Sequence, residues 1–371
     1  MFKSVLSLTL AAALGTASFG QTTLTAIPGE AAAAKYASIS QEILRAIEKG
    51  NEYLKSKQNP EGYWAQPSYP ALTALAVTAY MRDPANQGKP VPEYIRKGYD
   101  FILKSQKEDG SIFNRGMSSY NTAVCMMALL AANKEEYAPA ILKGRAYLIK
   151  QQNHFAPDNP YNGGIGYGDK QAPPIADLSN TSLALEAIYY SQKLAKDGKY
   201  GEQPDLDWNA ATEFINRCQQ NPAVNKEPWV SNDKSQLGGF VYRPGVSSAR
   251  DKKSAAFDKA EPPKAYGSMT YAGMQSLIYA NVDKNDPRVK LALKWLENSY
   301  SLDENPGMGV QGLYYYYQAM SKALSAMGID TLTLENGRKV DWRDELANKL
   351  ISIQKSDGSW VNTNNLSLIH I

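Results

Sequence analysis

The stretch Gln58-Asn-Pro-Glu-Gly62-Tyr-Trp64 decides the fold, because it recurs along the chain. It returns in compact form as Gln106-Lys-Glu-Asp-Gly110-Ser-Ile112 and Gln354-Lys-Ser-Asp-Gly358-Ser-Trp360, and in lengthened form within residues 152–165 and 219–240. Every copy carries a glycine two places before its final apolar side chain, and glycine accepts the positive φ of a tight turn. A period of about fifty residues predicts a fold built from repeated helical units.

The segment before each turn has the pattern of an amphipathic helix. Leu or Ile stands four places before the glutamine, and most copies carry an aromatic residue one place earlier still. In the copy before the turn at 305–309, Tyr300 replaces the glutamine. One polar and one apolar face are typical of a helix at the outside of a fold. We predict six outer helices, over residues 40–57, 93–105, 138–151, 208–218, 286–299 and 342–353.

The segment after each turn is more apolar and lacks a polar face. A helix that is apolar nearly all round is buried. We predict five inner helices, over residues 71–80, 122–132, 181–190, 270–280 and 313–327. Each unit is therefore an outer helix, a turn and an inner helix, and the chain is all-α.

The first twenty residues have the pattern of a secretory signal. Lys3 precedes an apolar run over residues 5–14, and small residues then lead to a cleavage position before Gln21. The run is too short to span a bilayer, which needs about 20 apolar residues. We predict an exported protein, periplasmic or secreted, with no membrane span once residues 1–20 are removed.

The remaining chain divides into three parts. Residues 21–38, rich in Ala and Thr, are expected to be a linker, and residues 39–362 to be the helical unit. The turn that ends at Trp360 should lead into a sixth inner helix, for which too few residues follow. We expect residues 363–371 to be a truncated or non-native tail.

Composition excludes several classes of protein. A net charge of +3, from 40 basic and 37 acidic side chains, gives no sign of the basic stripe of a nucleic-acid-binding protein. Two cysteines and two histidines do not support a disulfide scaffold or a metal cluster, so we predict no metal and no cofactor. Cys125 and Cys218 lie in different repeats, which leaves open whether they pair. The 24 tyrosines indicate an extensive aromatic surface inside the fold.

The Gln-x-x-Asp-Gly-Ser-Trp turn between paired helices resembles the QW repeat of squalene and oxidosqualene cyclases and of the related protein prenyltransferase β subunits. The resemblance covers about residues 40–362. It implies an α6/α6 toroid in which the inner helices line a central cavity, here with the sixth inner helix missing. It also implies that the turn residues Trp64, Ile112, Ile165, Phe240 and Trp360 are buried between successive helices.

The resemblance fails at the acid of the cyclases. Squalene-hopene-type enzymes carry Asp-x-Asp-Asp-Thr at an inner-helix start, and the matching stretch here is Asp177-Leu-Ser-Asn-Thr181. Ser179 replaces the protonating aspartate, and a serine hydroxyl is far too weak an acid to protonate an alkene. Asp177 is expected to cap a helix and is the one candidate for proton transfer. Zinc-dependent prenyl transfer is also disfavoured, because the family's Asp-x-Cys ligand pair does not occur.

The starts of the inner helices are the predicted site. Parallel inner helices would bring these starts to one mouth, where helix N-termini favour negative or carbonyl-bearing groups and tyrosines give flat apolar walls. Asp177 is the candidate catalytic residue. The candidate ligand-binding residues are Tyr120, Asn121, Ser179, Asn180, Tyr266, Thr270, Tyr271, Gln311, Tyr314 and Tyr315.

These observations predict an exported toroid that binds a ligand in an aromatic cavity without the usual cyclase acid. The ligand class stays open among isoprenoid, peptide and carbohydrate. Two other functions are compatible with the sequence. One is an active enzyme, either a terpenoid cyclase or transferase with a displaced acid or a polysaccharide-degrading α/α-barrel enzyme with paired carboxylates. The other is a protein-interaction scaffold, as repeat surfaces often are.

Overall fold

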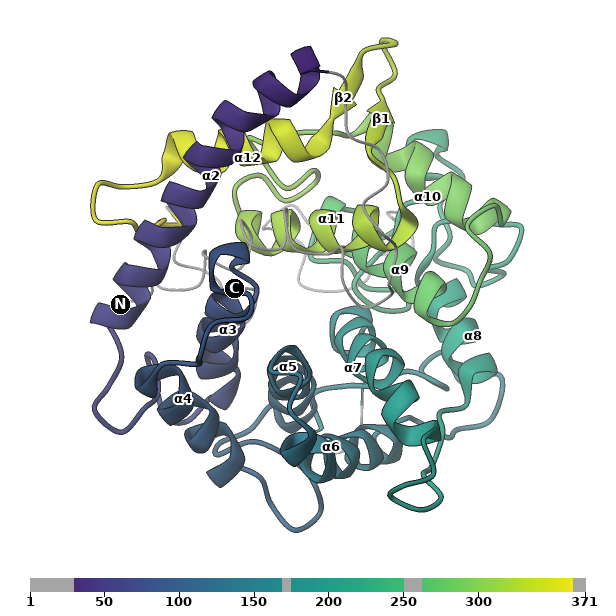
Figure 1. Ribbon diagram of the computed structural model, residues 1–371. Coiled ribbons are helices and arrows are strands. Elements are labelled where there is room, and N and C mark those ends of the chain that lie inside the picture. The colour runs from purple at the N-terminus through teal and green to yellow at the C-terminus, as the bar shows by residue number, and fades with distance from the viewer. Residues whose placement is uncertain (1–29, 169–174, 250–261, 363–371) are drawn as a thin grey trace.

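The described residues of this computed structural model, 30–168, 175–249 and 262–362, form helices where the sequence predicts them (Figure 1). The predicted signal over residues 1–20 and the tail over 363–371 lie outside these residues. Within them the chain forms eleven α-helices, three short 3-10 turns and one two-stranded sheet. None of these helices combines the length and the hydropathy needed to cross a membrane.

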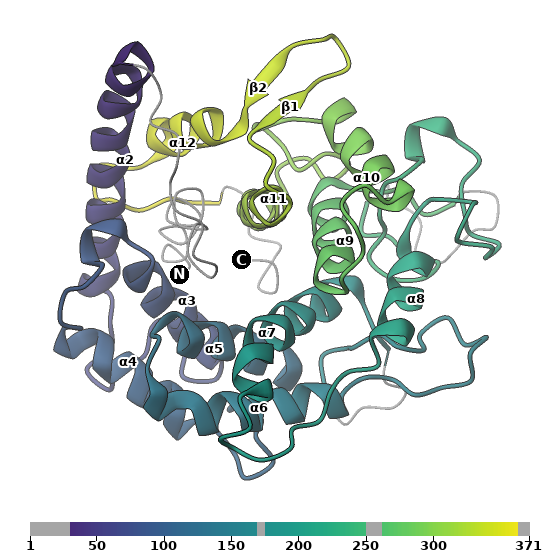
Figure 2. The ribbon, with the colours of Figure 1, turned by 45° about the vertical axis from the view of Figure 1, so that its right-hand side comes forward.

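Five apolar helices form the inner layer and pack against one another in chain order (Figures 1 and 2). Helix α3 packs on α5, α5 on α7, α7 on α9 and α9 on α11. The helices are α3 (Pro70–Met81), α5 (Ser118–Ala131), α7 (Leu178–Lys196), α9 (Gly267–Tyr279) and α11 (Leu313–Met327). Most of their side chains are buried, as expected for helices apolar nearly all round. All five predicted inner helices are thus confirmed.

The amphipathic helices lie outside this layer (Figure 1), and their buried side chains are mostly apolar. They are α2 (Glu30–Ser56), α4 (Glu93–Lys104), α6 (Ala138–Lys150), α8 (Trp208–Cys218), α10 (Pro287–Asn298) and α12 (Trp342–Ile353). All six predicted outer helices are confirmed. The first and the last of them, α2 and α12, also contact each other.

Two features differ from the prediction. Helix α2 begins at Glu30, so the second half of the expected linker 21–38 is helical, which fits the strong helix-forming run Glu30-Ala-Ala-Ala-Ala-Lys35. The sequence also did not predict the hairpin of β1 (Thr331–Thr333) and β2 (Lys339–Asp341). Its paired residues Leu332 and Val340 are buried, and Gly337 takes a positive φ in its turn.

The repeated glutamine joins each turn to the next outer helix. The side-chain amide of Gln58 donates to the carbonyl oxygen of Gly62 in its own turn, at 2.9 Å, and to that of Tyr94 in α4, at 2.7 Å. Gln106, Gln152 and Gln219 make the same two kinds of hydrogen bond at the following turns. The recurrence of this glutamine along the chain therefore reflects a side chain that satisfies two backbone carbonyl groups at once.

The same contact joins the two ends of the described chain. Gln354, after the last outer helix, donates to Gly358 at 3.0 Å and to the carbonyl oxygen of Ala46 in α2 at 2.8 Å. A side chain added at Gly358 would meet the Lys49 carbonyl of α2, as one at Gly62 would meet the Lys97 carbonyl of α4. The last turn thus packs on the first outer helix as each earlier glutamine turn packs on the helix that follows it.

The apolar residue that ends each turn is inserted between helices. Trp64, Ile112, Ile165, Phe240 and Trp360 are each at most 2% exposed, which confirms their predicted burial. The backbone N–H groups of the first four each donate to a threonine hydroxyl of the inner layer. These threonines are Thr73, Thr122, Thr181 and Thr270.

Candidate functional site

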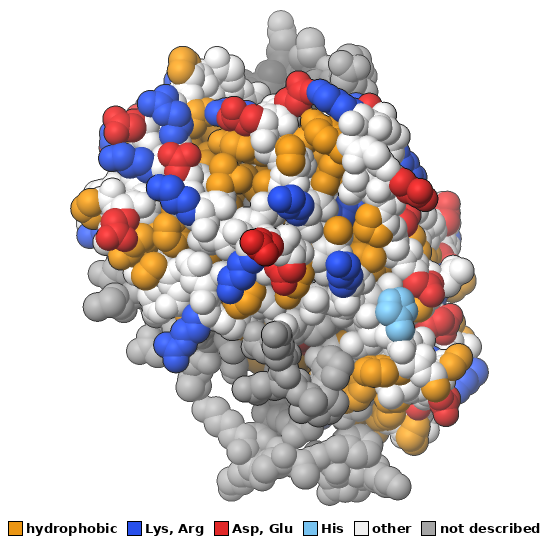
Figure 3. All heavy atoms as spheres, turned by 90° about the horizontal axis from the view of Figure 1, so that it is seen from below, with side chains coloured by type: hydrophobic (Ala, Val, Ile, Leu, Met, Phe, Trp, Pro, Cys, Tyr) orange, Lys and Arg blue, Asp and Glu red, His pale blue; other side chains and the backbone are white. Residues whose placement is uncertain are grey.

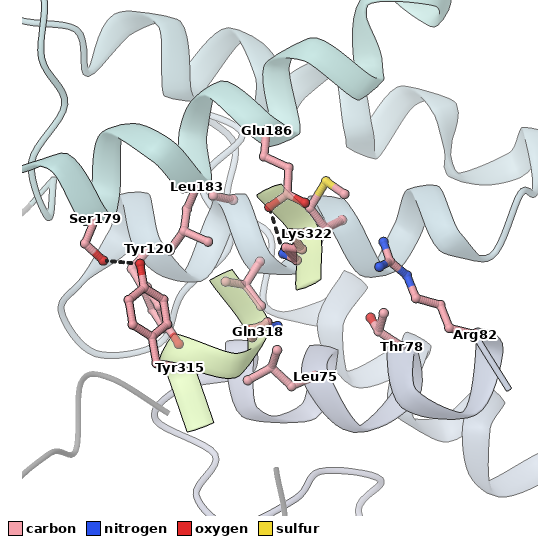
Figure 4. Close-up of a pocket in the computed structure, with 13 residues that line it drawn as sticks. Leu75, Thr78, Arg82, Tyr120, Ser179, Leu183, Glu186, Tyr315, Gln318 and Lys322 are labelled. Carbon is pink, nitrogen blue, oxygen red and sulfur yellow. Dashed lines mark hydrogen bonds and ion pairs between the residues drawn. The ribbon is translucent and has the colours of Figure 1, made fainter. Parts of the chain in front are cut away.

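A cavity lies among the inner helices α3, α5, α7 and α11 (Figure 4). Its volume is about 40 Å³. This is enough space for water molecules but too little for a ligand with a hydrocarbon chain. Among the described elements, α11 does not pack along α3 as the other inner helices pack along their neighbours. A ligand larger than this cavity would need side chains of the lining to move.

Hydroxyl groups line one end of the cavity, near the starts of the inner helices. Tyr120, Ser179 and Tyr315 come from α5, α7 and α11, and all three were predicted as ligand-binding residues. The Ser179 and Tyr315 hydroxyl groups lie 3.2 Å apart, within hydrogen-bond distance. Burial raises the pKa of both tyrosines well above the usual value, so both stay neutral phenols that can donate a hydrogen bond.

Charged groups line the opposite end. The Glu186 carboxylate of α7 accepts a hydrogen bond from the Lys322 ammonium of α11 at 2.8 Å, and their side chains are 5% and 15% exposed. Arg82, the C-cap residue of α3, points toward this end of the cavity (Figure 4). Glu186, Lys322 and Arg82 were not among the predicted site residues. A lone lysine in the otherwise uncharged segment 313–327 was the available signal.

Asp177 is a helix cap. It is 2% exposed and precedes α7, where its carboxylate accepts the Asn180 backbone N–H at 2.9 Å and the Asn180 side-chain amide at 2.8 Å. Burial raises the pKa of Asp177 to about 6, although hydrogen bonds from Asn180 and Tyr242 act in the opposite direction. The expected capping role is confirmed. Neither Asp177 nor Asn180 is among the side chains that line the cavity.

Replacing Asp177 with asparagine should alter how stability depends on pH. The carboxyl titrates near pH 6 when folded and near pH 3.8 when unfolded, so the folded state binds the extra proton between these values. This group's contribution to stability is therefore full below about pH 4 and is lost as pH rises through about 6. Asparagine also caps helices but does not titrate. Relative to wild type, the variant should gain about 1–3 kcal/mol of unfolding free energy between pH 4 and pH 7.5.

Urea unfolding of both proteins at several pH values measures this difference. Subtracting wild type from variant removes the contribution of other carboxylates that titrate in the same range. A difference that stays constant from pH 4 to pH 7.5 would show that Asp177 is ionised normally in the folded protein.

Three other predicted residues make hydrogen bonds within the fold. The Asn121 side chain accepts from the Ala71 backbone N–H at 3.1 Å and donates to two carbonyl groups before α5. The Thr270 hydroxyl accepts from Phe240 and donates to the Tyr266 carbonyl oxygen. Tyr266 is the N-cap residue of α9 and is 3% exposed. These residues position turns and helix ends, and they do not line the cavity.

The remaining predicted residues lie around the start of α11. The Tyr271 ring packs on that of Tyr316, with ring centres 5.6 Å apart. The Tyr314 hydroxyl donates to the Val361 carbonyl oxygen of the last turn at 3.2 Å. Gln311 is partly exposed, and its carbonyl oxygen accepts from Asn305. None of the three is among the cavity-lining side chains.

The two cysteines and the charged surface add little chemistry. Cys125 and Cys218 are both free and buried, and burial raises the pKa of each thiol well above its usual value. In the described part of the chain, no three His, Cys, Asp or Glu side chains gather in a way that could hold a metal ion. The face seen in Figure 3 mixes acidic and basic side chains.

No protein-family model matches the chain.

Proposed function

We propose that the chain is an α/α toroid related to the squalene cyclases and protein prenyltransferase β subunits, and that it is an exported protein that binds a ligand in its central cavity. The observation that carries the proposal is the cavity itself, which gathers side chains from α3, α5, α7 and α11 and includes three of the predicted residues. The Gln354–Ala46 contact supports a closed ring rather than an open solenoid.

The lining favours binding over cyclase chemistry. Ser179, at the position of the cyclase acid, is paired with the Tyr315 hydroxyl. Among the lining side chains the one carboxylate is that of Glu186, and it is paired with Lys322. Glycoside hydrolysis needs two carboxyl groups on either side of the bond, which this lining does not supply. A cavity lined by side chains from four helices also favours a bound ligand over a pure interaction scaffold.

The proposed ligand is amphipathic. Val124 and Leu183, each one helical turn after a hydroxyl residue of the lining, give the cavity an apolar middle between the hydroxyl groups and the charged groups. An isoprenoid or another chain with a polar end would match this order, whereas a carbohydrate would need polar partners along its whole length.

One observation favours a catalytic alternative. The pKa of Asp177 is about 6, which is suitable for proton transfer near neutral pH, and Tyr242 bonds to its carboxyl. In that case Asp177→Asn should abolish turnover of an identified substrate. Unchanged turnover would remove Asp177 from the reaction and leave ligand binding intact.

Mass spectrometry of molecules extracted from the purified exported protein tests the proposal. Leu183→Trp should exclude a bound molecule, because the larger side chain fills the apolar middle of the cavity. Leu237→Trp introduces the same side chain on an exposed loop and is the matched control. We expect one small molecule in extracts of wild type and control but not of Leu183→Trp. The same extract from all three folded proteins would overturn the proposal.

A further inference from the structure

Three inner helices each present three side chains to the cavity, and the last of the three is charged. On α3 the order is Leu75, Thr78, Arg82; on α7 it is Ser179, Leu183, Glu186; on α11 it is Tyr315, Gln318, Lys322. Each set has the three- or four-residue spacing of a single helix face, and each ends in a charged residue (Figure 4). Seven residues of helix rise about 10.5 Å, which separates the charged level from the hydroxyl level.

The charged level has one positive charge in excess. Glu186 and Lys322 neutralise each other at 2.8 Å. Arg82 has no hydrogen bond or ion pair from its guanidinium to any other described residue. Its neighbour Asp83 does not line the cavity, and the Asp83 oxygens accept hydrogen bonds from Asn51, Ala85 and Asn86 rather than from Arg82.

We propose that Arg82 binds the carboxylate of an amphiphile whose chain lies along Leu75 and Leu183. This inference rests on the proposed ligand-binding function and names the head group. A guanidinium presents two parallel N–H donors that match the two oxygens of a carboxylate. Lys322 lies at the same level but is held by Glu186, and the Glu186 charge disfavours a dianionic head group such as a phosphate monoester.

Isothermal titration calorimetry with decanoate and 1-decanol tests the head group. The two probes share a ten-carbon chain and differ in charge. Wild type should bind decanoate more tightly than 1-decanol by about tenfold or more, since a charge-assisted hydrogen bond adds to the shared chain contacts. Arg82→Gln should remove this preference, because it should weaken decanoate binding far more than 1-decanol binding. Arg96→Gln, which removes an exposed arginine from outer helix α4, should keep it.

Glu186→Gln gives an independent result in the opposite direction. It keeps the size of the side chain, removes the competing negative charge and frees Lys322, so decanoate affinity should rise. Equal binding of both probes by wild type, or a preference unchanged in Arg82→Gln, would overturn the carboxylate assignment and leave the proposed function standing. Binding of neither probe by folded wild type would overturn both.

Discussion

Replacing Trp64 with alanine should lower the free energy of unfolding by about 3–5 kcal/mol, the usual cost of truncating a buried tryptophan. Trp64 is 1% exposed, and its indole N–H donates to the Leu54 carbonyl oxygen at 2.7 Å. Alanine would leave a cavity between α2 and the inner layer and an unpaired carbonyl group. Trp360 repeats this geometry with Leu350, so the same substitution there should have a similar effect.

Thermal and urea unfolding of Trp64→Ala measure this loss. Trp208→Ala, at a half-buried position on α8, is the control and should cost less. Trp64→Phe retains the aromatic ring but not the hydrogen bond, and should fall between wild type and Trp64→Ala. An unfolding midpoint that does not move in Trp64→Ala would show that the turn residues do not hold successive helices together.

Replacing Gly163 with alanine should cost about 2–5 kcal/mol. Gly163 has a φ of +83°, which costs about 1–2 kcal/mol for a residue with a side chain. The new Cβ would also lie 1.9 Å from the Ala210 carbonyl oxygen of α8, so backbone must shift, at about 1–3 kcal/mol. The turn would then separate from the next outer helix.

Gly198→Ala separates the two causes. Gly198 also has a positive φ, of +75°, but no atom beyond its own chain neighbours lies within 4 Å of the position its Cβ would take. Only the conformational cost should appear there, about 1–2 kcal/mol. Equal losses of unfolding free energy in the two variants would show that close approach of the turn to α8 contributes nothing.

The helices and turns could be predicted because each repeat carries its own signal. Gln58, Gly62 and Trp64 each have a separate physical task, in hydrogen bonding, backbone conformation and packing, and the tasks recur at every turn. The hairpin at 331–341 has a local signal in Asn336-Gly337, but it occurs once and lies outside the repeat. The start of α2 was missed because its alanine-rich sequence also suits a linker.

The cavity could be predicted only in part. Tyr120, Ser179 and Tyr315 were found because each stands at the start of an inner helix, which the repeat alignment locates. The Glu186–Lys322 pair joins residues 136 positions apart, so no local pattern indicates it. Asn121 and Thr270 were predicted as ligand-binding residues because polar side chains at helix starts suit both a ligand and a neighbouring turn. In the structure they bond to neighbouring turns and helix ends.

The contact between Gln354 and Ala46 has a consequence for the order of folding. Most glutamine contacts join residues 34 to 69 positions apart, whereas this one spans 308. Loop-closure entropy grows with the logarithm of length, so joining the ends costs about 2 kcal/mol more than joining neighbouring repeats 36 apart. Units that pack locally should therefore form first, and the seam between α2 and the last turn should close late. Pulse-labelling hydrogen exchange during refolding should find the amides of α2 protected after those of α4 and α6.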